Sequence, residues 1–150
     1  MDKPKMLVGI DPDTEKSGWA LYHRGRRELL ILQCYDLATL FEELNKANSL
    51  YDLTVHLEAG WLERKSNWST RNQGGNGAKN EKIAKNVGSN HEIGRQIEKF
   101  CIKNDIVYKL IKPQGYSSWG HDQFCRVTKW PHSKSTNSEK RVAGLLVYGY

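Results

Sequence analysis

The chain has 150 residues, enough for one domain with a full core and too few for two comfortable ones, so we expect a single domain over residues 1–150. With 38% hydrophobic and 27% charged residues its composition is that of a globular protein, and no apolar run approaches the ~20 residues that cross a bilayer. The three cysteines show no CxxC spacing and the N-terminus has no signal-peptide core, which predicts a cytoplasmic protein without disulfides, zinc or a membrane partner.

The first three predicted elements are antiparallel strands. Apolar residues 6–10 end abruptly at Asp11, a polar turn follows, and residues 19–22 return as a second strand. A turn at residues 24–27 leads into a third strand that begins at residues 29–32. Asp11 therefore lies at the mouth of a hairpin, where a carboxylate suits a Mg²⁺ ligand; the alternative is an Asx residue that only starts a turn.

A second carboxylate ends the next predicted strand. Leucines and Phe41 at helical spacing predict a helix over residues 38–48, and alternating apolar residues predict a strand over 53–57 that finishes at Glu58. Helix-linked strands usually pair in parallel, so their carboxyl ends meet at one edge of a sheet. We therefore expect Asp11 and Glu58 to converge.

The middle of the chain combines a glycine-rich loop with a long helix. Residues 61–79 contain three glycines in positions 74–77 and are predicted to be irregular, whereas residues 81–103 carry an apolar face at helical spacing. Gly88 and Gly94 each cost this helix about 1 kcal/mol relative to alanine. A close neighbour is therefore expected there: a second copy of the helix, a nucleic-acid strand or, for Gly94, simple packing on the sheet.

The last third of the chain predicts a strand over residues 106–111, an irregular or weakly helical connector over 114–135 and a helix over 137–150. Thr136 or Asn137 can cap that final helix. The predicted order is three strands, helix, strand, long helix, strand and helix.

Two segments interleave basic side chains with tryptophan, a composition suited to a phosphate backbone with unstacked bases; the alternative is a solvated lysine-rich surface. The first segment holds Trp61, Arg64, Lys65, Trp68, Arg71, Lys79, Lys82 and Lys85. The second holds Arg126, Lys129, Trp130, Lys134, Lys140 and Arg141. Trp61 and Trp68 are candidates to stack on an unpaired base, with packing over the sheet edge as the alternative for Trp61.

Several short motifs together resemble the RuvC-type Holliday junction resolvases of the ribonuclease H-like superfamily. They are Gly9-Ile10-Asp11-Pro12, Ser17-Gly18-Trp19-Ala20, Leu57-Glu58, Asn86-Val87-Gly88, Lys112-Pro113 and Glu139-Lys140-Arg141-Val142-Ala143. The resemblance covers nearly the whole chain. It implies an α/β fold in which a five-stranded mixed sheet, three antiparallel strands followed by parallel ones, is flanked by helices. Compact stand-alone members of this kind also suggest a phage or mobile-element origin, and hence a bacterial or phage-infected cell.

The resemblance implies a homodimeric endonuclease of DNA recombination and repair that nicks four-way junctions symmetrically. Its chemistry needs two Mg²⁺ ions, for which Mn²⁺ can substitute, held by acidic side chains. Asp11, Glu58 and Glu139 match the expected catalytic ligands, with Asp13 as a further metal ligand. The long helix 81–103 would join the two copies, and Lys112, Lys134 and Arg141 would contact DNA together with the first basic segment.

The terminal helix departs from the family's pattern. The second of its two usual metal-binding places is Val142, which cannot bind a metal. Either Glu139 completes the site alone, or Asp13 substitutes, or the chain has lost cleavage and only binds branched DNA. A further hypothesis for the same fold is a nuclease that acts on RNA–DNA hybrids. His121 and His132 are candidate proton donors or DNA contacts, with ordinary surface residues as the alternative.

Overall fold

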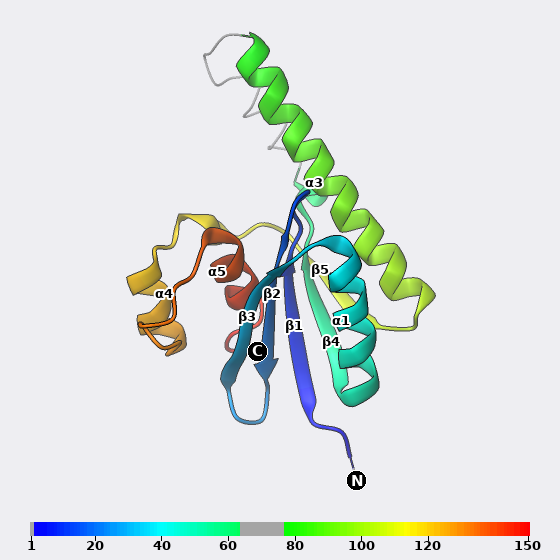
Figure 1. Ribbon diagram of the computed structural model, residues 1–150, viewed down its shortest axis with the longest axis vertical. Coiled ribbons are helices and arrows are strands. Elements are labelled where there is room, and N and C mark those ends of the chain that lie inside the picture. Colours follow the sequence, from blue (N-terminus) through cyan, green and yellow to red (C-terminus); the bar gives the residue numbers. More distant parts are fainter. Residues whose placement is uncertain (1, 64–76) are drawn as a thin grey trace.

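A five-stranded mixed sheet in the order β3-β2-β1-β4-β5 forms the centre of the computed structural model, which describes residues 2–63 and 77–150, with backbone only for 77–84 (Figure 1). Its strands are β1 (Lys5–Asp11), β2 (Ser17–His23), β3 (Glu28–Tyr35), β4 (Asp52–Glu58) and β5 (Val107–Ile111). Strands β1, β2 and β3 are antiparallel neighbours, whereas β4 runs parallel to β1 and β5 parallel to β4. The predicted mixed sheet is thus confirmed.

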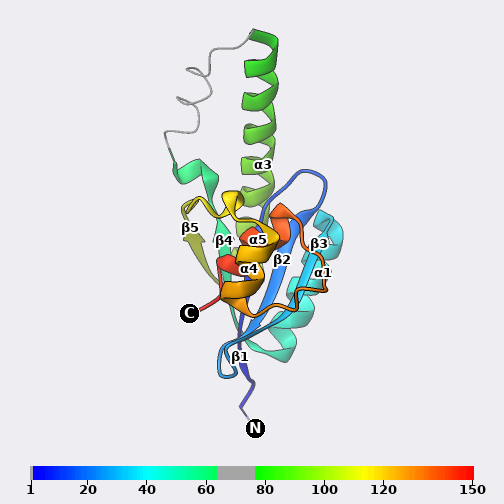
Figure 2. The same ribbon diagram turned by 90° about the vertical axis from the view of Figure 1, so that its left-hand side faces the viewer.

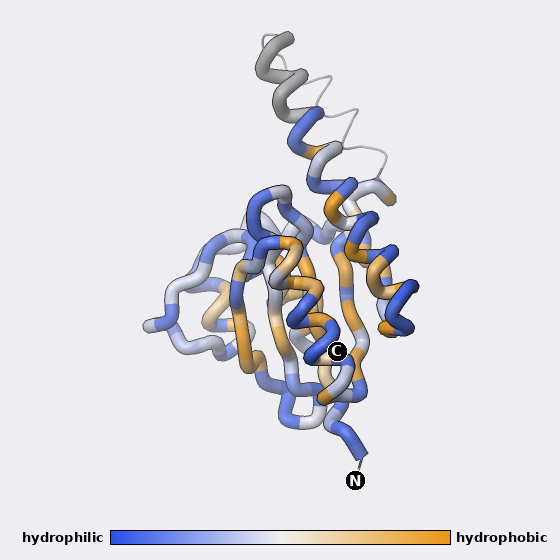
Figure 3. Tube along the Cα trace, turned by 45° about the vertical axis from the view of Figure 1, so that its right-hand side comes forward, coloured by the Kyte–Doolittle hydropathy of each residue, from blue (hydrophilic) through white to orange (hydrophobic). Residues whose placement is uncertain are grey.

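Helices cover both faces of this sheet (Figures 1 and 2). Helices α1 (Leu37–Leu50) and α3 (Gly77–Lys103) lie on one face, and α4 (His121–Thr128) and α5 (Ser138–Leu145) on the other. Because side chains alternate along a strand, β1 sends Met6, Val8 and Ile10 into the core beneath α1 and α3, while Leu7 joins the core beneath α4 and α5. Figure 3 shows the strands as mainly hydrophobic and the helices as a mixture of hydrophobic and hydrophilic residues.

Two predicted boundaries are wrong, the start of α3 and the end of the last helix. Within the stretch predicted to be irregular, a 3₁₀ turn η1 (Gly60–Leu62) follows β4 and α3 already begins at Gly77, because good helix formers precede the first apolar residue of its face. The connector contains a second 3₁₀ turn, η2 (Tyr116–Ser118), and the eight-residue helix α4, too short for periodicity to reveal. The last helix ends at Leu145, after which turns lead to Gly149 in the left-handed region at φ 90°.

Helix α3 is the longest element, with 27 residues, and its N-terminal part extends well beyond the sheet (Figure 1). Its C-terminal part packs through Ile97 and Cys101, both fully buried. Across the described ranges, none of the helices is both long enough and apolar enough to pass through a bilayer.

The glycines of α3 differ in their surroundings. A Cβ atom built on Gly94 would overlap the indole ring of Trp61 and come within 3.3 Å of Pro12, so α3 rests directly on the segments that follow β1 and β4. A Cβ atom built on Gly88 would meet nothing within 4 Å apart from the neighbouring residues of its own helix, in the described part of the chain. The close packing predicted at Gly94 is confirmed, with Trp61 and Pro12 as the neighbours.

We therefore predict that alanine changes stability in opposite directions at these two glycines. Gly94→Ala must displace Trp61 or the helix, which costs about 1–3 kcal/mol of unfolding free energy. Gly88→Ala gains helix propensity in open space and stabilises by about 0.5–1 kcal/mol. Urea unfolding of both variants beside the native chain measures the difference, and equal stability of the two would contradict the described packing of α3.

Candidate functional site

The pairing of β1 with β4 brings Asp11 and Glu58 together. In the parallel register Ile10 lies opposite Leu57, so the next residue on each strand leaves the same end of the sheet. Both preceding residues are fully buried, which anchors the two strand ends in the core. The carboxyl groups of Asp11 and Glu58 share a hydrogen bond. The predicted convergence of these two acids is therefore observed.

Burial sets the electrostatics of this pair. Loss of solvent, followed by the negative charges of Glu58 and Glu139, raises the pKa of Asp11 to about 8. Burial likewise raises the pKa of Glu58. The pair thus holds a proton near neutral pH, and no lysine, arginine or histidine of the described residues forms an ion pair with either acid. Such a pair is chemically suited to replace its proton with a cation.

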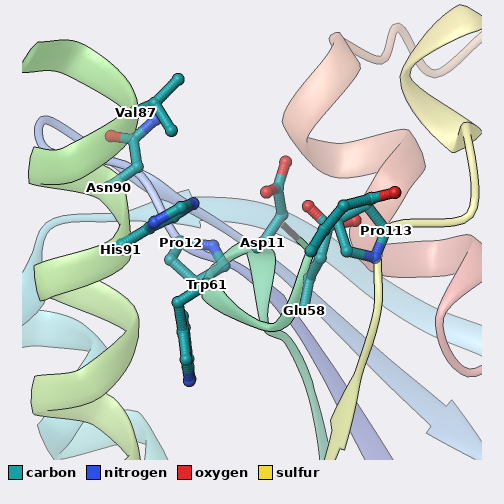
Figure 4. Close-up of a pocket in the computed structure, with 10 residues that line it drawn as sticks. Asp11, Pro12, Glu58, Trp61, Val87, Asn90, His91 and Pro113 are labelled. Carbon is teal, nitrogen blue, oxygen red and sulfur yellow. The ribbon is translucent and has the colours of Figure 1, made fainter. Parts of the chain in front are cut away.

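A cavity of about 300 Å³ opens beside the carboxyl pair (Figure 4). Helix α3 forms its opposite wall with Val87, Asn90 and His91, and Glu63 and Pro113 also line it. The side-chain oxygen of Asn90 accepts a hydrogen bond of 3.1 Å from the backbone N–H of Thr14, which ties α3 to the β1–β2 loop. The cavity therefore has walls from four separate parts of the chain: the end of β1, the segment from the end of β4 to Glu63, helix α3, and the residues after β5.

His91 is a residue of this cavity that the sequence analysis missed. Its Nε2 atom lies only 2.7 Å from where a Cβ on Gly60 would be, and its ring meets the Trp61 ring edge to face with centroids 6.3 Å apart. Burial and the neighbouring Arg95 lower the pKa of His91, so its ring is neutral at pH 7. Residues 87, 91 and 94 are spaced i, i+4 and i+7 and therefore lie on one face of the helix. This spacing is the sequence signal from which His91 could have been found.

Helix α5 brings the third predicted acid, Glu139, toward Asp11. The Asn137 side chain caps the helix by accepting a 2.9 Å hydrogen bond from the backbone N–H of Lys140. A Cβ on Gly18 would overlap the backbone oxygen of Glu139, so the first turn of α5 lies directly on β2. Gly18 is also the residue of β2 that pairs with Asp11. Glu139 is near enough to raise the pKa of Asp11. Even so, no three His, Cys, Asp or Glu side chains of the described residues form a ready metal cluster.

Two further residues of the predicted site have local roles. An oxygen of the Asp13 carboxylate accepts hydrogen bonds from the backbone N–H groups of Glu15 and Lys16, at 3.0 and 3.4 Å, and shapes the β1–β2 turn. Val142 is buried, with 3% of its surface exposed, and it does not line the cavity. Metal binding by Asp13 stays a prediction.

The predicted DNA-binding residues divide into three groups. Arg64, Lys65, Trp68 and Arg71 lie outside the described residues, and the side chains of Lys79 and Lys82 are likewise not described. Trp61 lines the cavity under Arg95, Lys85 is exposed on α3, and the exposed Lys112 directly follows the β5 residue that pairs with Glu58. The last two residues do not line this cavity: Lys134 lines a different cavity, and Arg141 donates hydrogen bonds to the Trp119 carbonyl and the Thr136 hydroxyl.

The two candidate histidines serve the segment around α4. The ring nitrogens of His121 contact the Thr136 hydroxyl and the carbonyl oxygen of His132, each at 2.8 Å. His132 in turn pairs with Asp122. These contacts fasten the loop after α4, and neither histidine lines the cavity beside Asp11.

The donor set of the site fits a hard divalent cation. Mg²⁺ binds one or two protein carboxylates and completes its shell with waters and substrate phosphates, so a complete cage of protein ligands is not required. Asp11 and Glu58 provide two such carboxylates on rigid strand ends. Glu139 provides additional negative charge from α5.

The fold belongs to the ribonuclease H-like class, with three antiparallel strands followed by parallel ones between two layers of helices. No protein-family model matches the sequence, and no curated protein matches it significantly. Among solved structures, T. thermophilus RuvC in complex with Holliday junction substrate is similar, with a TM-score of 0.53. That similarity covers 95% of this chain and 93% of the other at 10% sequence identity, and it establishes the shared fold.

The carboxyl pair predicts how Asp11→Asn changes stability with pH. Because the pKa of Asp11 is raised from 3.8 to about 8, the folded state loses stability as pH rises through this window. The amide cannot ionise, so Asp11→Asn should be more stable than the native chain at pH 8 in the absence of metal, and the gap should shrink toward pH 4. Thermal unfolding in EDTA measures the gap, at about 2–4 °C per kcal/mol. A constant gap across this range would contradict the raised pKa.

Proposed function

We propose that this protein is a Mg²⁺-dependent endonuclease that nicks branched DNA, with four-way junctions as its substrate class. The observation that carries the proposal is the hydrogen-bonded pair of Asp11 and Glu58 at the end of two parallel strands, with no ion-pair partner among the described residues. The ribonuclease H-like fold supports it, since the similar RuvC structure is a complex with Holliday junction substrate. Sequence motifs and structure thus favour the same chemistry.

Asp11 and Glu58 would hold the first ion, and Glu139 would help to hold a second. When bound, the metal lowers the pKa of a water nucleophile and stabilises charge on the leaving oxygen; Mn²⁺ can replace Mg²⁺. His91, neutral at pH 7, lies across the cavity and can accept a proton at its unprotonated ring nitrogen. Lys112, beside Glu58, would neutralise a phosphate next to the cut bond.

Two copies would be needed for symmetric nicks in a four-way junction. We propose that they associate through residues 81–103 of α3, because the N-terminal part of this helix extends beyond the sheet (Figure 1). A two-fold axis there would present two sites of equal polarity to the matching strands of the junction.

A second candidate function is a protein that binds branched DNA without cutting it. Val142 supports this candidate, because an apolar residue occupies a place where related nucleases carry an acid, and the described residues contain no ready three-ligand cluster. Both candidate functions use the same fold and the same branched DNA. They differ in whether Asp11, Glu58 and Glu139 are sufficient for cleavage.

Removing either carboxylate of the pair should abolish nicking. With Mg²⁺ and a synthetic four-way junction, Asp11→Asn and Glu58→Gln should each lower the nicking rate at least 10³-fold, about 4 kcal/mol of transition-state stabilisation. Glu42→Gln, the same loss of charge on the exposed surface of α1, is the control. Mg²⁺ should also raise the Tm of the native chain and not that of Asp11→Asn. Native-like nicking by both site variants would contradict the assignment, and faster cutting of RNA–DNA hybrids than of junctions would change the substrate.

The role of Val142 is tested by Val142→Asp beside Val142→Asn. Both bury a polar group and should lower stability by about 1–3 kcal/mol, but only aspartate adds a potential metal ligand. If the native site is sufficient, neither variant nicks faster than the native chain. A native chain that binds junctions without cutting, together with nicking gained by Val142→Asp alone, would establish the second candidate.

A further inference from the structure

The fold joins two basic segments that are far apart in the sequence. The turn between β2 and β3 carries Arg24, Arg26 and Arg27, and the segment after α4 carries Lys129 and Lys134. A cavity of about 650 Å³ lies between the two segments, and a second of about 340 Å³ adjoins it, sharing Arg27 and Tyr148. We call this surface the basic groove, defined by Arg24, Arg26, Arg27, Lys129 and Lys134.

The charge of the basic groove is mostly uncompensated. All five cations are exposed. Within the described ranges only Arg26 has an acidic partner, Glu28, with nitrogen and oxygen 3.1 Å apart. Lys134 holds its ammonium group 5.4 Å from the centre of the Trp130 ring. Clustered cations without acids repel one another and raise the affinity for a polyanion.

Two of these cations occupy backbone positions that suit glycine better. Arg27 has φ 52° and Lys129 has φ 63°, both in the left-handed region. Lys129 follows the last residue of α4 and donates its backbone N–H to the Cys125 carbonyl at 2.9 Å, an ordinary place for glycine. The local fold therefore does not explain a long basic side chain at either position.

The basic groove lies at the opposite end of the sheet from the carboxyl pair. Asp11 pairs with Gly18 at one end, and Met6 pairs with His23 at the other, next to the β2–β3 turn. The five residue steps along β2 from Gly18 to His23 correspond to about 17 Å. Figure 1 shows the turn at the lower end of the sheet and α3 crossing the upper end. A phosphate in the groove is thus not the phosphate beside Asp11.

The aromatic residues of the groove indicate which polyanion it takes. Trp130 is only 9% exposed and donates its indole N–H to the Lys134 carbonyl, and Tyr22 is fully buried, so neither of these rings offers a face to an unstacked base. Tyr148 is half-buried, and Tyr150, 55% exposed beside the smaller cavity, is the one exposed aromatic residue of the described chain that lines either cavity, too little for a row of stacked bases. Single-strand sites rely on such stacking, whereas duplex backbones are bound by cations alone. We propose that the basic groove binds the phosphate backbone of duplex DNA and, given the proposed function, holds one arm of the branched substrate away from the cleavage site.

The double variant Arg27→Gly/Lys129→Gly separates binding from folding. Its Tm should equal or exceed that of the native chain, because glycine is the better residue at both backbone angles. Its affinity for a short labelled duplex, measured by fluorescence anisotropy in EDTA, should fall about tenfold at low salt. The slope of log K against log salt should become shallower by about two.

Lys46→Glu on the exposed surface of α1 is the matched control, since it also changes the net charge by two. It should keep native affinity and slope. Equal duplex binding by the double variant and the native chain would overturn the proposal, as would a loss seen only with a single-stranded probe. The nicking assay tests the proposed function separately. If the native chain does not nick DNA but the double variant still loses affinity for the duplex, the proposal for the basic groove stands and the nuclease proposal fails.

Discussion

The contact between the carboxyl groups of Asp11 and Glu58 is the constraint on which the site depends. The charged forms of the two acids repel one another. They are nevertheless held together, because β1 and β4 are anchored in the core by the fully buried side chains of Val8, Ile10 and Leu57. A shift of the β1–β4 register, which would separate the two acids, would also move these apolar residues out of the core. The sheet therefore stabilises an arrangement that the side chains alone disfavour, and a proton or a cation relieves it.

Glycines allow the helices to approach this pair closely from two sides. Gly9 and Gly18 leave room for the backbone oxygens of Ala143 and Glu139, so α5 lies directly on β1 and β2. Gly94 does the same for α3 against Trp61. Backbone packing thus places His91 and Asn90 of α3 in the wall of the cavity, and it brings Glu139 of α5 close enough to act on the charge of Asp11.

The sequence predicted the sheet and the convergence of Asp11 and Glu58, because both depend on local patterns: apolar alternation along a strand and a carboxylate at its end. It did not predict His91, whose place depends on how α3 crosses Trp61. Helix α4 lies in the connector that was predicted to be irregular or weakly helical, and its bounds could not be predicted because eight residues carry too little periodicity. The basic groove depends on two segments that meet only in the folded chain, and single-sequence patterns do not register such pairs.

The central claim is that the pair of Asp11 and Glu58 exists to hold a divalent cation. The most direct measurement is a crystal structure with saturating Mn²⁺ at mildly alkaline pH, using the anomalous signal of manganese to locate the ions. The account predicts an ion between the two carboxyl groups, with the hydrogen bond between them lost. An empty site with the carboxyl groups still hydrogen-bonded to each other would contradict it.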